Sequence, residues 1–283
     1  AAARLLTDHP DYRVLRRLPD LGSRTFAPTH DLETRVGLVI DVETEGLDSA
    51  KDRIIELAAR RFRFDARGNI VQIGELRLWR EDPGRPLSPA IMNLTGLTDD
   101  DLVGQSIDDE AATALLQSAE VIFAHNAPFD APRVEHRLSG AAGLAWACSL
   151  HDIDWASLDF EGRSLTQLVQ RTGYFFDAHS AENDINALLH LLSHRFDDGT
   201  TVLAKLIEGA ERPTLKLEAA GAPFEAKDQL KARGYRWDTN ARVWWTEIPL
   251  SEEIDEQIWL QRNNCRCSPR LTPVTWNTRH RPL

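Results

Sequence analysis

Three strand-forming segments in succession constrain the fold of this chain more than any other feature. Residues 36–43 form an apolar run that ends in acidic residues, and residues 53–64 and 70–80 are two further strand runs. Residues 65–69, between the last two, have the composition of a hairpin turn. We therefore expect the core to begin with three adjacent strands.

Helical patterns and short strands alternate in the next part of the chain. Residues 181–194 carry the strongest helical signal, because apolar residues recur there at the spacing of one helix face. We predict helices at residues 107–118, 128–138, 165–171 and 181–194, and strands at residues 120–124 and 144–148. Three strands followed by such an alternation predict an α/β fold, with a mixed sheet flanked by helices on both faces.

The strong periodicity ends between about Phe196 and Pro213, where we place a domain boundary. The predicted organisation has five parts: an N-terminal arm with a short helix (residues 1–35), a main domain (36–197), a linker or helix (198–212), a small α+β module (213–262) and a tail (263–283).

The charge of the chain is uneven. The net charge is −11, from 33 Lys and Arg against 44 Asp and Glu. Residues 212–283 hold 12 basic and 9 acidic residues, or +3, so the remainder is 21 minus 35, or −14. Bulk electrostatic coating of nucleic acid is excluded by this balance. An acidic body that handles nucleic acid must use local sites or bound cations.

Cysteine usage and hydropathy predict the compartment. Three cysteines, Cys148, Cys265 and Cys267, are too few for a disulfide framework and suit the reducing cytoplasm. Cys265 and Cys267 supply only two of the four ligands of a structural zinc, so we predict that they lie in a surface tail. No apolar run approaches the ~18 residues of a membrane span, and the first residues lack the apolar core of a signal peptide. We expect a cytoplasmic protein that has no membrane partner.

Two carboxylates, Asp41 and Glu43, lie at the end of the first strand run. Residues two apart on a strand point to the same face. Two like charges this close are unfavourable unless a cation lies between them, and Mg²⁺ prefers such oxygen ligands. The alternative is a pair of solvated acids at a strand terminus.

Two later segments add further candidates. Asp130 follows a strand and Pro128, which can open a helix, so its carboxylate is predicted near the strand ends. Ser180 is a natural N-cap for the long helix. His179 then lies just outside that helix and Asp184 one turn inside it, where both can face one site. Taken singly, these residues could instead be a first-turn acid, a loop histidine and a polar helix flank.

Together these segments resemble the DEDDh exonucleases, the family of the proofreading epsilon subunit, RNase T and oligoribonuclease. Asp-Val-Glu-Thr-Glu-Gly from Asp41 matches the first motif, D-x-E-T-x-G, and His-Asn-Ala-Pro-Phe-Asp from His125 matches the second. His179 and Asp184 match the third, His-x₄-Asp, and Leu94-Thr-Gly-Leu-Thr resembles a segment that many members carry. The resemblance spans about residues 36–195.

The resemblance implies an RNase H-like fold and a two-metal mechanism with Mg²⁺ or Mn²⁺. By the same resemblance, Asp41 ligates both ions, and Glu43 and Asp184 hold the ion on the side of the nucleophile. Asp130 acts mainly in the outer coordination shell. His179 is implied to be the general base that takes a proton from the attacking water.

Members of this family seat the terminal nucleotide around residues that correspond to Thr44, Gly46 and Leu47, and Asn126 is a further substrate-binding candidate. Leu47 is a candidate stacking wedge, with plain core packing as the alternative. Glu45 stands where many members have Thr, and this departure concerns substrate contacts rather than metal binding.

The resemblance therefore predicts a 3′→5′ exonuclease that releases nucleoside 5′-monophosphates from the 3′ end of DNA or RNA. The expected partner is nucleic acid with a free 3′ end, single-stranded DNA being favoured. Two alternatives stay open: a proofreading-type or adaptor subunit that acts through a polymerase or repair partner, and an exoribonuclease specific for RNA or oligonucleotides. No residue can be assigned to sensing a 2′-hydroxyl.

The C-terminal module interleaves basic and aromatic residues. We predict a short helix ended by Gly234 and a hairpin that turns at residues 238–241. Aromatic residues beside cations suit single-stranded nucleic acid, and we predict that Arg242 and Trp244 contact it. The alternatives are that the tryptophans form the core of the module, or that the module docks a partner.

Overall fold

The computed structural model describes residues 6–7, 9–22, 24–25, 33–48, 51–263 and 265–281. Within it the chain forms two compact units: unit 1 (residues 1–209 and 280–283) and unit 2 (residues 210–279). The helix predicted in the N-terminal arm falls largely outside the described residues. The described part of the arm contributes β1 (Arg16–Arg17) and β2 (Arg24–Thr25). No helix in the described ranges is long and apolar enough to cross a membrane.

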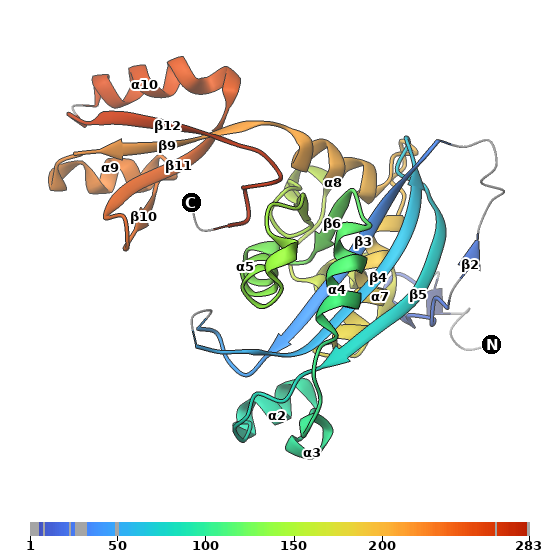
Figure 1. Ribbon diagram of the computed structural model, residues 1–283. Coiled ribbons are helices and arrows are strands. Elements are labelled where there is room, and N and C mark those ends of the chain that lie inside the picture. The colour runs from blue at the N-terminus through green and yellow to red at the C-terminus, as the bar shows by residue number, and fades with distance from the viewer. Residues whose placement is uncertain are drawn as a thin grey trace. The chain divides into compact units, whose positions relative to one another are not determined.

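Unit 1 is built on a six-stranded sheet in the order β2-β5-β4-β3-β6-β7 (Figure 1). The three long strands, β3 (Thr34–Thr44), β4 (Ile54–Asp65) and β5 (Ile70–Arg80), are antiparallel neighbours. The short strands β6 (Val121–Ala124) and β7 (Trp146–Cys148) extend the sheet in parallel with β3. This mixed sheet confirms the predicted RNase H-like fold class.

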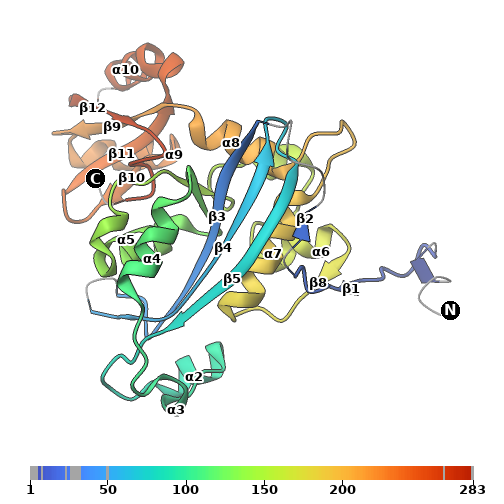
Figure 2. The ribbon, with the colours of Figure 1, turned by 45° about the vertical axis from the view of Figure 1, so that its right-hand side comes forward.

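Helices cover both faces of the sheet, as the alternating pattern predicts (Figures 1 and 2). On one face, α4 (Asp109–Gln117) and α5 (Ala127–Arg137) pack on Leu38, Ile40 and Val42 of β3. On the other face, α7 (Ala181–Ser193) packs on β3 and β4, with α6 (Leu165–Arg171) beside it. Since side chains alternate along a strand, Asp41 and Glu43 point to the α7 face.

Two short helices, α2 (Pro89–Thr95) and α3 (Asp99–Leu102), lie where no secondary structure was predicted. Ser88 caps α2 through a bond from the Ile91 amide, and Gly96 ends it in the left-handed region at φ 73°. These helices surround a small apolar cluster of Ile55, Leu87, Leu97 and Leu102. Their tertiary packing explains why short segments of weak periodicity are helical.

Helix α8 (Val202–Glu211) follows the other elements of unit 1 in the sequence and precedes the first strand of unit 2. Unit 2 has a four-stranded antiparallel sheet in the order β10-β11-β9-β12. Its elements are β9 (Thr214–Ala220), α9 (Lys227–Ala232), β10 (Arg236–Asp238), β11 (Val243–Pro249), α10 (Glu253–Arg262) and β12 (Ser268–Val274). Gly234 follows α9 at φ 99°, which confirms it as the residue that ends this helix.

The C-terminal region differs from the prediction. Residues 263–283, predicted as a tail, contain β12, which pairs with β9 along its whole length. Pro269 and Pro273 make this segment a poor strand by sequence, but β12 is an edge strand, where proline is tolerated. Cys265, predicted to lie on the surface, is buried in the core of unit 2.

Candidate active site

The carboxylates of Asp41 and Glu43 lie at the carboxyl end of β3, on the face that α7 covers. One oxygen of each, together with one of Asp184 on α7, forms a group whose atoms all lie within 4.8 Å of one another. The register of β3 and β4 shifts directly after Glu43. The strand pairing thus ends where the two acids project.

Asp130 reaches the same place from the next strand. The chain leaves β6, turns through Asn126 in the left-handed region at φ 96°, and enters α5, with Pro128 in the first helical positions. This turn brings Asp130, which is 3% exposed, against β3, where the backbone amide of Val42 donates to its carboxylate.

His179 and Asp184 are linked through the backbone. The Oδ2 atom of Asp184 accepts hydrogen bonds from the amides of His179 (2.9 Å) and Ser180 (3.2 Å). Ser180 occupies the predicted N-cap position, but its hydroxyl makes no capping bond. Asp184 instead reaches back to the amides of the N-cap residue and of the residue before it, which fixes the turn into the helix. His179 is held at φ 70°, a conformation that non-glycine residues adopt rarely, and its side chain is exposed.

All five of these side chains line one pocket of about 160 Å³. The lining residues are Asp41, Val42, Glu43, His125, Asn126, Phe129, Asp130, His179 and Asp184. The predicted catalytic and metal-binding residues, which come from three separate segments of the chain, are therefore brought together. Of the four predicted substrate-binding residues, Asn126 lines the pocket, Thr44 is the last residue of β3, and Gly46 and Leu47 lie on the loop that follows.

The electrostatics of the pocket are dominated by negative charge. Burial raises the pKa of Asp41 well above its ordinary value, and the charges of four other carboxylates raise it further: Asp130, Asp184, Glu43 and Glu56. Burial, with Asp184 and Glu56, raises the pKa of Glu43 to about 7. Burial also raises the pKa of Asp130 and of Asp184.

This donor set fits a divalent cation. Carboxylates that share a partly desolvated pocket resist ionisation unless positive charge compensates them. The charges that act most strongly on Asp41 are all carboxylates, so its main charged neighbours add repulsion and no compensation. Oxygen donors within 4.8 Å of one another suit a hard cation such as Mg²⁺.

The loop after β3 is fixed by contacts on both sides. Thr44 is buried, and its hydroxyl donates to the carbonyl of Gly46 (2.6 Å). The side chain of Leu47 is 85% exposed, so the core-packing alternative for this residue is wrong. Arg133 of α5 donates to the Leu47 carbonyl (2.6 Å) and stacks on the ring of Phe129 (3.6 Å to its centroid).

Glu45 has a structural role that its place in the motif did not suggest. Its carboxylate accepts from Arg85 (2.6 Å) and from the Arg53 amide (2.9 Å), and its side chain is only 5% exposed. The departure from the family motif at Glu45 therefore concerns the anchoring of the loop, and a direct contact with substrate is disfavoured.

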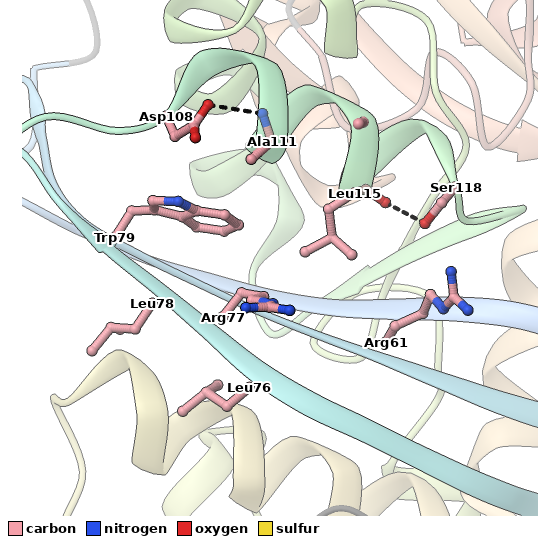
Figure 3. Close-up of a pocket in the computed structure, with 10 residues that line it drawn as sticks. Arg61, Leu76, Arg77, Leu78, Trp79, Asp108, Ala111, Leu115 and Ser118 are labelled. Atoms are coloured by element: carbon pink, nitrogen blue, oxygen red, sulfur yellow. Dashed lines mark hydrogen bonds between the residues drawn. The ribbon is translucent and has the colours of Figure 1, made fainter.

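A larger groove, of about 740 Å³, lies away from the acidic pocket, between β5 and α4 (Figure 3). The sheet side presents Arg61, Arg77 and Trp79, and the helix side presents Ala111 and Leu115. Asp108 is the one carboxylate among its described lining residues, so this groove does not gather acidic side chains as the smaller pocket does. Size alone therefore does not identify the reactive site, and the acidic pocket remains the candidate.

Comparison with known proteins identifies the family. A family model described as an exonuclease, of the RNase T type, matches residues 38–192, which include every element that lines the acidic pocket. The chain belongs to this exonuclease family. The first, second and third motifs (residues 41–46, 125–130 and 179–184) all lie within the matched region.

The relatives and solved structures that are similar to this exonuclease align with different fractions of its chain. The PolC-type DNA polymerase III of Listeria monocytogenes serovar 1/2a is 39% identical over 101 residues, which are 35% of this chain and 7% of that protein. The Bacillus subtilis (strain 168) protein of the same name gives the same values. The chain thus spans only about 7% of the length of these relatives.

Among solved structures, Exonuclease X in complex with 5′ overhanging duplex DNA aligns with 61% of this chain and 91% of its own, at 20% identity and a TM-score of 0.42. Escherichia coli Exonuclease I in complex with a dA16 oligonucleotide aligns with 82% of this chain and 68% of its own, at 15% identity and a TM-score of 0.46.

Two residues near the acidic pocket, Glu56 and Arg133, were not predicted from the sequence. Glu56 is 4% exposed, lies opposite Glu43 in the antiparallel register, and is paired with Arg80 (3.0 Å). A carboxylate within the apolar run of residues 54–59 was the available signal. Arg133, one turn after Asp130, carried no signal, because its partner Leu47 is 86 residues away.

The raised pKa of Glu43 has a measurable effect on stability without cations. The folded protein holds this proton more tightly than the unfolded chain, so the free energy of unfolding falls as pH rises from about 4.5 to about 7. The loss from this group is about 3 kcal/mol, at ~1.4 kcal/mol for each unit by which the pKa is raised. In EDTA, Glu43→Gln should therefore raise the free energy of unfolding at pH 8 by this order and leave it little changed at pH 4.

Urea denaturation at both pH values measures this effect. Glu161→Gln is the matched control, because Glu161 is exposed and lies outside the pocket. The control should unfold with the wild-type pH dependence. If the Glu43→Gln variant is no more stable than wild type at pH 8, the negative charge of Glu43 in the pocket does not lower the free energy of unfolding.

Proposed function

We propose that this chain is a 3′→5′ exonuclease that uses divalent cations to hydrolyse DNA from a free 3′ end, releasing nucleoside 5′-monophosphates. The observation that carries this proposal is the convergence of four carboxylates and His179 on one pocket, in a member of the exonuclease family. We assign the domain to residues 36–197, which enclose the matched region.

Asp41, Glu43 and Asp184 would hold the cations, since their oxygens lie within 4.8 Å of one another. Asp130 lines the same pocket and would act mainly from outside this group. When bound, two Mg²⁺ or Mn²⁺ ions supply positive charge to the scissile phosphate and to both oxygens of the displacement. Their charge also lets an acidic pocket accept a polyanion, which the net charge of −11 alone would repel.

His179 is proposed to take the proton from the attacking water. Its imidazole is exposed at the pocket, so it can reach a water molecule without being a ligand. The hydrogen bond from its amide to Asp184 fixes the backbone at this residue. A histidine is suited to accepting a proton near neutral pH.

The loop after β3 is proposed to receive the terminal nucleotide. Leu47 presents an apolar side chain to solvent, while Arg133 holds its carbonyl in place. Because the backbone is already held, this apolar side chain can contact a terminal base with less loss of backbone entropy on binding. Thr44, Gly46 and Asn126 would provide the polar contacts around it.

DNA is favoured as the substrate because the PolC-type relatives are DNA polymerases that share 39% identity over 101 residues with this chain. Side-by-side digestion of labelled single-stranded DNA, duplex DNA and single-stranded RNA, with Mg²⁺ and with Mn²⁺, tests this preference. Faster digestion of RNA would favour an exoribonuclease.

The polarity of digestion is a separate prediction. An oligonucleotide with a 3′-terminal phosphate should resist digestion, because the site is proposed to grip a free 3′ end, whereas a 5′ block should have no effect. Gel analysis of 5′-labelled and 3′-labelled strands measures both. A circular single strand is the control and should stay intact. Shortening from the 5′ end, or cutting of the circle, would contradict the proposal.

A further inference from the structure

The sheet of unit 2 has one face covered by its own helices and one that they leave open. Leu215, Leu217 and Ala219 of β9 form the covered face, in one apolar cluster with Leu230 of α9 and Leu260 of α10. Lys216 and Glu218 alternate with them and therefore point to the other face. That second face is the subject of the inference.

The strand register places a row of side chains across this face. Arg236 of β10 lies opposite Trp245 of β11, Trp245 lies opposite Glu218 of β9, and Glu218 lies opposite Arg270 of β12. Residues that are paired directly across strands share a face. We call this row, together with the neighbouring Lys216, the open face.

The register also separates the two adjacent tryptophans. Trp244 packs against the core of unit 2, so the prediction that it contacts nucleic acid is not supported by its position. Trp245 is one residue further along β11 and therefore projects to the open face. The alternative that the tryptophans form a core is thus correct for Trp244, while Trp245 remains available.

Trp245 is the centre of a cationic cluster. The guanidinium of Arg236 lies 4.2 Å from the centroid of its ring, and the ammonium of Lys216 lies 5.2 Å from it. Both distances fall within the range of cation–π contacts. Trp237, next in sequence to Arg236, is paired with Trp244 and contacts its ring (5.5 Å between centroids), so it lies on the opposite face and is not part of this cluster.

The charges of this region do not cancel. Glu218 is bonded by Lys216 (3.2 Å) and Arg270 (2.9 Å), and Glu247 in the next row is bonded by Arg279 (2.8 Å). Asp238, two residues from Arg236 on β10, lies on the same face, where the charge of Lys216 acts on it. Four cations (Lys216, Arg236, Arg270 and Arg279) therefore face three carboxylates (Glu218, Asp238 and Glu247), which leaves a surplus of one positive charge.

We propose that the open face of unit 2 binds single-stranded nucleic acid, by stacking a base on Trp245 and Arg236 and by pairing backbone phosphates with Arg236 and Arg270, which are both exposed. Lys216 is only 6% exposed, so it contributes its charge beside Trp245 and no direct phosphate contact. A stacking aromatic beside a positive surface is the arrangement that binds unpaired strands with little sequence preference. A double helix has no free base to stack. The open face shares no residue with the acidic pocket, and the proposal does not depend on the proposed hydrolysis.

The test measures binding without hydrolysis. The full chain in EDTA is titrated into a 5′-fluorescein-labelled 20-nucleotide oligo-dT, and anisotropy gives Kd at several salt concentrations. Without cations the acidic pocket repels the strand, so binding elsewhere is what this measurement reports. Duplex DNA of the same length should bind more weakly than the single strand.

Trp245→Ala should raise Kd about five- to hundredfold, the loss expected for one stacked base, and should leave the slope of log Kd against log salt unchanged. Arg236→Ala should raise Kd and also reduce the magnitude of that slope by about 0.7, because one phosphate contact is lost. Arg262→Ala, which removes the same charge from the exposed end of α10, is the matched control and should stay within about twofold of wild type.

Thermal unfolding of each variant shows whether unit 2 stays folded. If the Trp245→Ala variant is unfolded, the Trp245→Phe variant is used in its place. In the wild-type protein, oligo-dT should quench tryptophan fluorescence. The Trp245→Phe variant should keep most of the affinity for oligo-dT and lose most of this quenching. Equal effects of Arg236→Ala and Arg262→Ala, or quenching that Trp245→Phe leaves unchanged, would overturn the proposal. Such a result would leave the proposed hydrolysis untouched, since that is measured separately with Mg²⁺.

Discussion

Chelation of divalent cations with EDTA is expected to abolish hydrolysis of a labelled single-stranded oligonucleotide, and excess Mg²⁺ or Mn²⁺ should restore it. Cations in such a site stabilise the transition state by several kcal/mol, so the rate should fall at least about a thousandfold. Two physical effects contribute to the loss. The carboxylates around Asp41 would then repel the scissile phosphate, and nothing would offset the charge that develops during displacement.

Release of mononucleotides, followed by chromatography, measures this effect. Protein treated with EDTA and then supplied with Mg²⁺ beyond the chelator is the control, because it separates loss of cations from irreversible unfolding. Undiminished release of mononucleotides in EDTA would contradict the assignment of Asp41, Glu43 and Asp184 to cation binding.

His179→Ala is expected to lower kcat by about 10²- to 10⁴-fold while cation affinity stays near that of wild type. The side chain is at the pocket but outside the group of three carboxylates whose oxygens converge. Asp184→Ala should lower both kcat and cation affinity, because it removes one of those three anions. Calorimetric titration with Mn²⁺ and steady-state rates on an oligonucleotide measure the two quantities.

Asp184 has a second role that a matched variant can separate from its charge. Its Oδ2 atom accepts from the amides of His179 and Ser180, so Asp184→Ala also releases the turn that positions His179. Asp184→Asn keeps an acceptor oxygen for these amides but removes the charge. Equal cation affinities of Asp184→Asn and wild type would show that this carboxylate holds no cation.

Wild-type turnover by His179→Ala at saturating Mg²⁺ would mean that another group takes the proton. The other imidazole of the pocket is His125, whose Nδ1 lies 2.8 Å from the Ser149 hydroxyl. Burial lowers the pKa of His125 to about 4, so it would be a weak base at neutral pH. The structure thus makes His125 a poor replacement for His179.

The main elements of unit 1 were predictable from local patterns. Strands at residues 36–43, 53–64 and 70–80 correspond to β3, β4 and β5, and the helix predicted at residues 181–194 corresponds to α7. Each signal comes from residues within one segment, because the repeat of a strand or a helix is a local property. The same applies to Gly234, whose left-handed conformation follows from the helix that it ends.

Several features of the surroundings were not predictable, because they depend on partners distant in the chain. The charge of Glu56 acts on Asp41 and Glu43 only because the register of β4 against β3 places it opposite Glu43, and Arg133 holds Leu47 across 86 residues. Strand β12 was missed because its prolines argue against a strand, whereas pairing with β9 at an edge permits them.

The sequence alone determined which chemistry is available here: acids at a strand end, a histidine and an acid at a helix start, and basic residues interleaved with tryptophans. Only the tertiary structure decided which of those side chains share a surface. Successive side chains of a strand point to opposite faces of the sheet. Whether Trp244 or Trp245 lies on the open face therefore depends on which face the helices of unit 2 cover. In the same way, Asp41, Asp130 and Asp184 form one pocket because the sheet and two helices bring three distant segments together.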